Sequence, residues 1–157
     1  YAPGNDPRRL LQREAAIAAE ELFKRAQKEE IHLWGISGYR SYKRQEELFS
    51  SANGRSGVAP PGCSEHQTGL ALDISCPDEN YELEESFAKT KEGCWLARHC
   101  ALFGFILRYP KNKEEITGFP FEPWHIRYTG IGLASSLTLT GMTLEEYYER
   151  GLHLPPK

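Results

Sequence analysis

The first part of the chain carries the clearest pattern of apolar and charged positions. Between residues 7 and 30, apolar side chains recur at three-to-four spacing with Arg, Glu and Lys between them, as in an amphipathic helix. Asn5 and Asp6 precede Pro7, which gives a suitable N-cap with proline at the first helical position. The pattern therefore predicts one helix over residues 7–30.

Shorter apolar runs predict strands. They cover residues 31–36, 70–75, 105–109 and 121–128. Within residues 70–75 apolar and polar side chains alternate, so Leu72 and Ile74 are expected on one face of the strand and Asp73 on the other.

Further helices are predicted over residues 43–52, 95–103 and 143–150, ended by Asn53-Gly54, Gly104 and Gly151. Loops are expected at residues 55–63 and 110–119, and the charged stretch 78–92 is a surface helix or a loop. Helices gathered around a few antiparallel strands indicate an α+β fold, a small antiparallel sheet flanked by helices. A parallel βαβ sheet is the alternative.

Length and composition narrow the class of protein. A chain of 157 residues is expected to form a single domain over residues 1–157. Its 39% hydrophobic and 26% charged residues are typical of a globular protein and exclude a disordered chain. The net charge of −3 offers no basic excess, so we expect no nucleic-acid partner. We also expect the protein to be a monomer. The longest apolar run, at 101–107, is far shorter than the roughly 18 residues of a transmembrane helix.

The cysteines give little further information. They are too few for a disulfide scaffold at this length, and none forms the C-x-x-C pair of a zinc ribbon. An even number permits two bridges, and the sequence leaves their pairing open. The four are Cys63, Cys76, Cys94 and Cys100.

Candidate metal ligands stand in two short clusters. His66 and Asp73 lie in residues 64–73, and Glu122 and His125 follow in residues 121–125. Two imidazoles and one carboxylate are typical of catalytic zinc, which keeps a fourth position open for water. Zinc makes that water more acidic, and a nearby glutamate can accept its proton. The sequence thus offers His66, Asp73 and His125 as ligands and Glu122 as general base.

Structural explanations compete with this interpretation. Each histidine could be a hydrogen-bonded structural residue, and Asp73 could pair with Arg40. Glu122 and His125 are three positions apart and would point to opposite faces of a regular strand. Pro123 between them favours a kink or an edge position, which would let the two side chains converge. The remaining histidines, expected to be structural or solvent-facing, are His32, His99 and His153.

Four ordered segments resemble a known family. They are SGYRSY at 37–42 with Gln45 after it, SEHQTGLALD at 64–73, GFILRYP at 104–110 and EPWHIRY at 122–128. Together they resemble the VanY-type zinc D,D-carboxypeptidases and their L,D-carboxypeptidase relatives, which trim bacterial peptidoglycan stem peptides. The wider group includes lysostaphin-type and hedgehog-type zinc domains. The resemblance covers nearly the whole domain and implies a hedgehog/D,D-peptidase-like zinc fold.

The resemblance also implies catalytic roles, residue by residue. His66, Asp73 and His125 would hold Zn²⁺, and Glu122 would activate the water. Arg40 would polarise the scissile carbonyl and stabilise the negative charge that develops on its oxygen, a task for a fixed cation in a dry site.

Other matching residues would contact the substrate. Ser64 and Gln45 correspond to the family's polar contacts with the terminal carboxylate of the substrate, although Gln45 also fits a solvated helix position. Trp124 and Tyr39 are expected in the pocket wall or the core. Cys63 has no role in the motif, so we treat it as structural, or bridged if the protein is exported.

The implied function is a zinc-dependent carboxypeptidase that removes the C-terminal D-Ala from peptidoglycan stem peptides, with D,D-cleavage favoured. L,D-cleavage of the tetrapeptide and dipeptidase action on free D-Ala-D-Ala are alternatives from the same motifs. A non-catalytic zinc-containing wall-binding module is a further alternative, against which the presence of both Glu122 and Arg40 argues. Because mature stem peptide lies outside the bacterial membrane, we expect an exported or anchored protein at the extracellular face or in the wall, with its leader absent from this chain.

Overall fold

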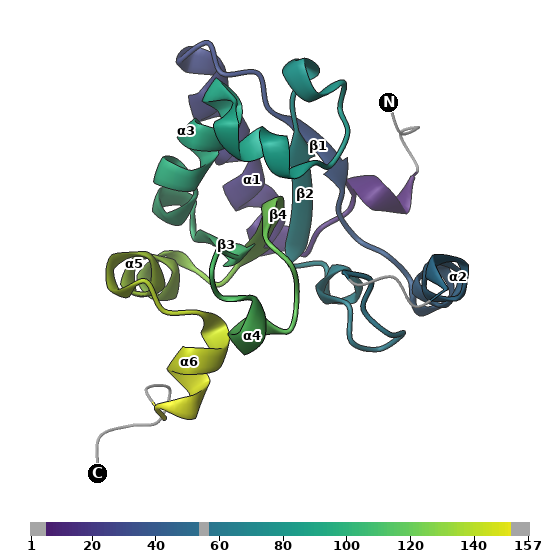
Figure 1. Cartoon of the computed structure of the whole chain (residues 1–157). Coiled ribbons are helices and arrows are strands. Elements are labelled where there is room, and N and C mark those ends of the chain that lie inside the picture. Colours follow the sequence, from purple (N-terminus) through teal and green to yellow (C-terminus); the bar gives the residue numbers. More distant parts are fainter. Residues whose placement is uncertain (1–5, 54–56, 152–157) are drawn as a thin grey trace.

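The computed structural model describes residues 6–53 and 57–151 (Figure 1). The helices are α1 (Arg13–Lys28), α2 (Tyr42–Ala52), α3 (Lys91–His99), α4 (Glu114–Thr117), α5 (Ile131–Thr140) and α6 (Leu144–Glu149). The strands are β1 (Trp34–Ser37), β2 (Ala71–Ser75), β3 (Phe105–Tyr109) and β4 (Glu122–Tyr128). Short 3₁₀ turns join them: η1 (Pro7–Arg9), η2 (Glu65–Thr68), η3 (Pro77–Glu79), η4 (Glu85–Lys89) and η5 (Cys100–Phe103).

The strands form one sheet in the order β1-β2-β4-β3, and every neighbouring pair is antiparallel. This confirms the predicted α+β fold with an antiparallel sheet, and the parallel alternative is wrong. In Figure 1, α1 lies behind the sheet, α3 stands to its left, and α2 is separated from both on the right. The sheet is therefore covered by α1 and α3 on one side, while α2 stands apart.

Side-chain alternation along β2 assigns one face of the sheet to the core and the other to the polar site. Leu72 and Ile74 pack with Ile126 of β4, with apolar side chains of α1 such as Leu22, and with Leu96 of α3. The predicted alternation is thus confirmed. Every residue of β2 is nevertheless buried, so the polar face is also shielded from solvent.

The pairing of β4 with β3 contains an irregularity next to Pro123. Leu107 pairs with Ile126, but Tyr109, two residues further along β3, pairs with Glu122, four residues further back along β4. The predicted kink is therefore present. The suggested edge position is wrong, because β4 lies inside the sheet between β2 and β3.

The amino-terminal helix is shorter than predicted. Asp6 caps a separate 3₁₀ turn, η1, through the backbone N–H of Arg8, and Leu10 is extended. Gly38 N–H donates to Arg8 O at 2.6 Å, and Tyr39 N–H donates to Leu10 O at 2.8 Å. The segment therefore bonds to the chain that follows β1 instead of continuing the helix, and α1 begins only at Arg13. The Asn5 part of the predicted cap lies outside the described residues.

The carboxy-terminal part departs most from the prediction. The sequence did not predict a helix over α5. This helix packs against β3: its Ala134 and Leu137 form a second apolar cluster with Ile106 of β3 and with Leu144 of α6. The helix predicted over residues 95–103 begins earlier, at Lys91, and gives way to η5 after His99. The predicted loop 110–119 contains the short α4, and the charged stretch 78–92 holds η3, η4 and the first residues of α3.

Within the described ranges, none of the helices is long and apolar enough to span a bilayer. The four cysteines, which all lie within these ranges, are free thiols in the structure.

Candidate metal centre and active site

His66 reaches the site from the turn η2, between α2 and β2. Gly69 ends this turn with a φ of +71°, the left-handed conformation that glycine adopts without strain, and the chain then enters β2. The Nδ1 atom of His66 lies 2.7 Å from the carbonyl oxygen of Gly38. Because a carbonyl only accepts, Nδ1 carries the proton in the neutral ring. This leaves the lone pair of Nε2, which lies 3.2 Å from Asp73 Oδ2, available to bind a metal ion.

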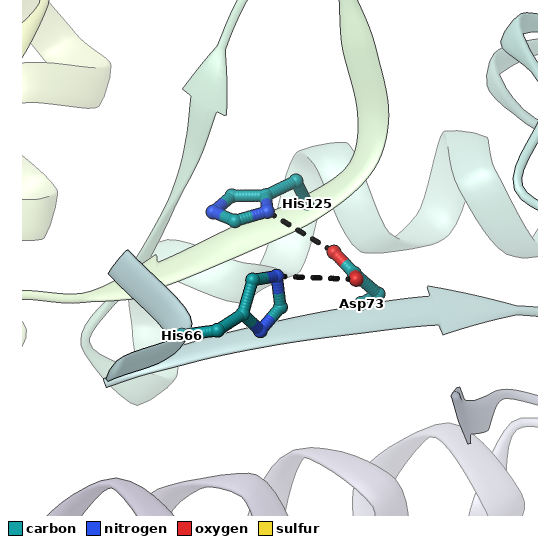
Figure 2. A group of neighbouring side chains, drawn as sticks. All are labelled: His66, Asp73 and His125. Carbon is teal, nitrogen blue, oxygen red and sulfur yellow. Dashed lines mark hydrogen bonds and ion pairs between the residues drawn. The ribbon is translucent and has the colours of Figure 1, made fainter. Parts of the chain in front are cut away.

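Asp73 and His125 come together through the strand register. They are directly opposite one another in the pairing of β2 with β4, which puts both side chains on the same face. His125 Nδ1 lies 3.0 Å from Asp73 Oδ1. Figure 2 shows the carboxylate of Asp73 beside the two imidazole rings, with a dashed line to each of them. One donor atom from each of His66, Asp73 and His125 lies within 4.8 Å of the others, and all three residues are buried.

The electrostatics of this cluster favour a cation. Burial by itself lowers the pKa of His125, but the hydrogen bonds to Asp73 and Glu65 outweigh it and raise the pKa to about 9. Burial raises the pKa of Asp73, but the charges and hydrogen bonds of His66 and His125 hold it well below its usual value. Two imidazoles and a carboxylate that draw positive charge into a buried space fit zinc by donor type and number.

Glu122 lies at the start of β4, beside the proposed ligands. The irregular pairing next to Pro123 brings its Oε2 to 3.9 Å from His125 Nδ1, so the two side chains converge as the site requires. Burial, opposed by His125 but assisted by the negative charge of Asp73, raises the pKa of Glu122 to about 7. A carboxyl group with this pKa can both accept and release a proton near neutral pH.

Arg40 and Gln45 form a hydrogen-bonded pair. Arg40 Nη1 donates to Gln45 Oε1 at 2.9 Å, and Nη2 approaches Ser37 Oγ at 3.4 Å. Gln45 is 1% exposed and its Nε2 donates to Ala59 O at 2.6 Å, so it is not the solvated helix residue that we considered. Arg40 thus bonds to Gln45 rather than to Asp73. Burial lowers the pKa of Arg40, while the charge of Asp73 opposes that shift.

These residues line one cavity of about 460 Å³. The proposed catalytic, substrate-contacting and metal-ligating residues all border it, and Trp124 is in its wall as expected, whereas Tyr39 is outside the lining. The candidate site residues in the lining are Arg40, Gln45, Ser64, His66, Asp73, Glu122 and His125.

Two aromatic side chains in the cavity wall, Tyr109 and Phe119, were not predicted from the sequence. Tyr109 stacks on Phe119 with ring centroids 4.6 Å apart, and its ring centroid lies 5.0 Å from that of His125. Tyr109 was in a matching segment without a role, and Phe119 was in a predicted polar loop. Since no motif assigned either residue to the site, only the folded chain identifies them.

The other histidines within the described ranges, His32 and His99, do not line this cavity. His99 stacks on Trp95 at 4.5 Å, and its Nδ1 lies 2.7 Å from the Trp95 carbonyl oxygen, which fits the expected structural role. His32 precedes β1 and its backbone N–H donates to Glu92. His153 is outside the described residues.

Comparisons with known proteins place the chain in a family. The family model VanY, described as D-alanyl-D-alanine carboxypeptidase, matches residues 8–131. The protein YodJ of Bacillus subtilis is 45% identical over 150 residues, which cover 91% of this chain and 55% of YodJ. The chain therefore belongs to the VanY family, and it spans about half the length of this relative.

Solved structures agree with this family and its cofactor. The LD-carboxypeptidase LdcB superposes with a TM-score of 0.89 at 43% identity, over 94% of this chain and 72% of LdcB. A mutant of the vancomycin-resistance D,D-pentapeptidase VanY, in complex with Zn(II), superposes with a TM-score of 0.74 at 34% identity, over 88% of this chain and 83% of its own. This relative holds Zn(II), and the His-Asp-His cluster of the present chain is a donor set that fits the same metal.

Proposed function

We propose that this chain is a zinc-dependent carboxypeptidase that removes the C-terminal D-alanine from peptidoglycan stem peptides. One observation carries the proposal: the buried carboxylate of Glu122 lies beside three buried donor atoms in a cavity that also holds the guanidinium of Arg40. The proposed ligands are His66, Asp73 and His125. Membership of the VanY family supports the same reaction class.

The proposed division of labour follows from the charges in the cavity. When bound, zinc supplies Lewis-acid chemistry, polarising a carbonyl oxygen and making water more acidic. Glu122 accepts the proton of the attacking water on a carboxylate oxygen and then passes it to the nitrogen of the departing D-alanine. Burial holds the pKa of this carboxyl group above its ordinary value, which favours release of the accepted proton to the leaving amine.

Arg40 faces the same space with its fork held by Gln45 and Ser37. A guanidinium fixed in advance can stabilise the negative charge on the scissile carbonyl oxygen without reorganising during the reaction. We assign Ser64 and Gln45 to the terminal carboxylate of the substrate, since both border the cavity. Gln45 keeps a second amide N–H for this contact while its oxygen accepts from Arg40.

For the specificity we propose D,D-cleavage, in agreement with the description of the matching family model. L,D-cleavage of a tetrapeptide stem is the second candidate, because LdcB, an LD-carboxypeptidase, superposes with a TM-score of 0.89. Because stem peptides lie outside the bacterial membrane, either activity would be exercised at the cell wall.

Mass spectrometry of two parallel reactions tests the function. Zinc-loaded protein is incubated with a stem peptide ending in L-Lys-D-Ala-D-Ala and with one ending in L-Lys-D-Ala. Loss of one alanine from the first peptide alone supports D,D-cleavage, and loss from the second alone assigns the L,D-reaction. If both peptides stay intact while the protein holds zinc, the proposed activity is wrong.

A further inference from the structure

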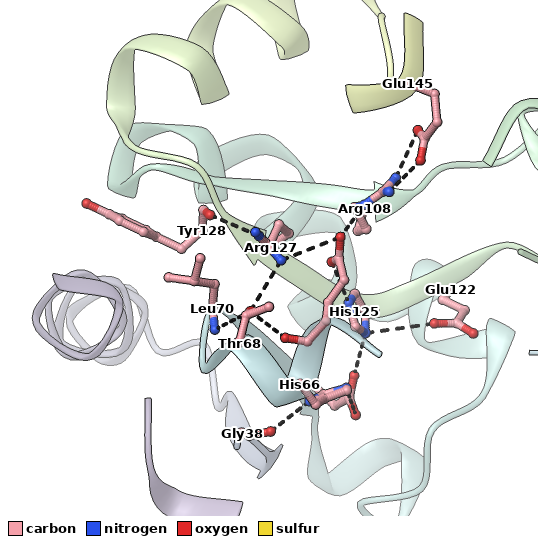
Figure 3. A network of polar contacts seen from close by, with 12 residues as sticks. Gly38, His66, Thr68, Leu70, Arg108, Glu122, His125, Arg127, Tyr128 and Glu145 are labelled. Atoms are coloured by element: carbon pink, nitrogen blue, oxygen red, sulfur yellow. Dashed lines mark hydrogen bonds and ion pairs between the residues drawn. The ribbon is translucent and has the colours of Figure 1, made fainter. Parts of the chain in front are cut away.

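A chain of charged side chains leads from the metal centre to the carboxy-terminal helix α6. His125 Nε2 lies 3.4 Å from Glu65 Oε2, and Arg108 Nε donates to Glu65 Oε1 at 2.7 Å. Both terminal nitrogens of Arg108 donate to the carboxylate of Glu145, with the Nη1 to Oε2 distance at 3.0 Å. In Figure 3, Arg108 points to Glu145 at one end of this network, and His125 lies at the other.

The network is shielded from water. The side chains of Arg108 and Glu65 are 11% and 14% exposed, and that of Glu145 is 26% exposed. The planar fork of Arg108 therefore joins two carboxylates in a region where water competes little for its N–H groups. Removal of Glu145 would leave Arg108 with Glu65 as its remaining acidic partner. Glu65 itself also lies 3.6 Å from Arg127 Nη1.

The contacts of His125 make this network relevant to the metal. Its Nδ1 faces Asp73 in the proposed ligand set, so Nε2 is the atom that remains for a second partner. Metal-binding histidines commonly donate this second N–H to a carboxylate, which fixes both the ring orientation and the tautomer. Glu65 occupies that place, and Arg108 fixes the orientation of Glu65 together with Arg127, whose Nη1 lies 3.6 Å from the same carboxylate oxygen.

We propose that Glu65, Arg108 and Glu145 are positioning residues that fix the ring of His125 and thereby increase the affinity of the chain for zinc. The inference rests on the proposed metal site. The VanY match ends at residue 131, whereas α6 spans Leu144–Glu149. In this chain a helix beyond the matched segment thus contributes to the metal centre.

A purely structural role for Arg108 would be the attachment of α6 to the rest of the protein. The helix already has a second attachment of that kind, because Lys113 Nζ lies 2.9 Å from Glu146 Oε1. Arg108 differs from Lys113 because it also donates to Glu65, which contacts the proposed ligand His125. The neighbouring residues Glu145 and Glu146 therefore form a matched pair for experiment. Each is a negatively charged residue of α6 that forms one ion pair with the rest of the protein, and only Glu145 belongs to the network.

Competition with a chromophoric chelator measures the zinc dissociation constants of the intact chain, of three single variants and of the double variant that combines Glu65→Ala with Glu145→Gln. For Glu65→Ala we expect the dissociation constant to rise about 10- to 100-fold, the usual effect of losing an outer partner of a ligand. For Glu145→Gln we expect a smaller rise, at least about threefold. Glu146→Gln should stay within about twofold of the parent, because glutamine still serves in the capping box with Thr143.

The thermal midpoints of the zinc-free proteins separate positioning from attachment. If Glu145→Gln and Glu146→Gln lower the midpoint similarly and only Glu145→Gln weakens zinc binding, the inference stands. It also requires that Glu145→Gln has little further effect in the Glu65→Ala background, since the two residues act through one path. Parental zinc affinity in both Glu65→Ala and Glu145→Gln would overturn it. If the unaltered chain does not bind zinc, the proposed metal site itself is wrong.

Discussion

Asp73 and His125 stand directly opposite one another on neighbouring antiparallel strands, and His125 Nδ1 lies 3.0 Å from Asp73 Oδ1. The backbone hydrogen bonds of the sheet thus hold two of the three proposed ligands at a set distance. His66 comes from a turn, and its position depends on the hydrogen bond to Gly38 O. Two of the proposed ligands therefore come from paired strands and the third from a turn, and all three are buried.

Replacement of His66 should remove zinc and activity together. His66→Ala leaves two donors in the cluster, too few to hold the ion at micromolar concentration, so we expect less than about one tenth of the parental zinc content. Metal analysis after gel filtration measures this. His99→Ala is the control, because His99 stacks on Trp95 away from the cavity and should keep one zinc. A fully occupied His66→Ala protein would show that His66 is not a ligand.

Replacement of Glu122 should separate zinc binding from catalysis. Glu122→Gln keeps the shape and all three proposed ligands but cannot accept a proton. We therefore expect parental zinc content and a kcat lower by about 10²- to 10⁴-fold. Steady-state kinetics of D-alanine release, with zinc analysis of the same sample, checks both values. Near-parental turnover in this variant would exclude Glu122 as the base.

Arg40 should be needed as a guanidinium and not merely as a positive charge. Lysine cannot reproduce the fork that contacts both Gln45 and Ser37, so Arg40→Lys should lower kcat about 10²-fold or more with zinc content unchanged. Arg44→Lys, which alters an exposed residue paired with Glu47, should be neutral. Equal activity of the two variants would contradict the proposed role of Arg40.

Two glycine-to-alanine changes in helices should have opposite effects on stability. At Gly93 in α3, an added Cβ would lie 1.9 Å from the carbonyl oxygen of Phe87, so we expect a loss of about 3 kcal/mol from backbone displacement. At Gly132 in α5 the Cβ would meet nothing within 4 Å, and alanine should stabilise the helix by up to about 1 kcal/mol. Thermal unfolding of the two variants, with Tm changes of opposite sign, checks this difference.

The parts of the fold predicted from the sequence are those with local patterns. The alternation of apolar and polar side chains predicted strand β2 and the face of the sheet on which Asp73 lies. Pro123 predicted the kink that lets Glu122 approach His125. Helix α5 was missed because its residues are small or apolar all round and offer no polar face with a helical period. A helix of this kind is stabilised by packing against side chains of β3, which lie too far away in the sequence to appear in a local pattern.

The network behind the metal centre was equally hidden from sequence reasoning. Arg108 is 43 residues from Glu65 and 37 residues from Glu145 along the chain. Glu65 and Arg108 lay within matching segments, but charged side chains there are equally consistent with solvent exposure. Only the packing of α6 against the sheet shows that Arg108 joins two carboxylates. The ligands, by contrast, had chemistry distinctive enough to be proposed from residue type and spacing.

The most direct test of the account is a zinc titration of metal-free protein during cleavage of a stem pentapeptide. Released D-alanine should increase in proportion to added zinc until one ion is bound per chain and should not increase beyond that point. His66→Ala should release none at the same zinc concentrations. Release by the metal-free chain, or one bound zinc with no release from either the pentapeptide or the tetrapeptide, would contradict the account.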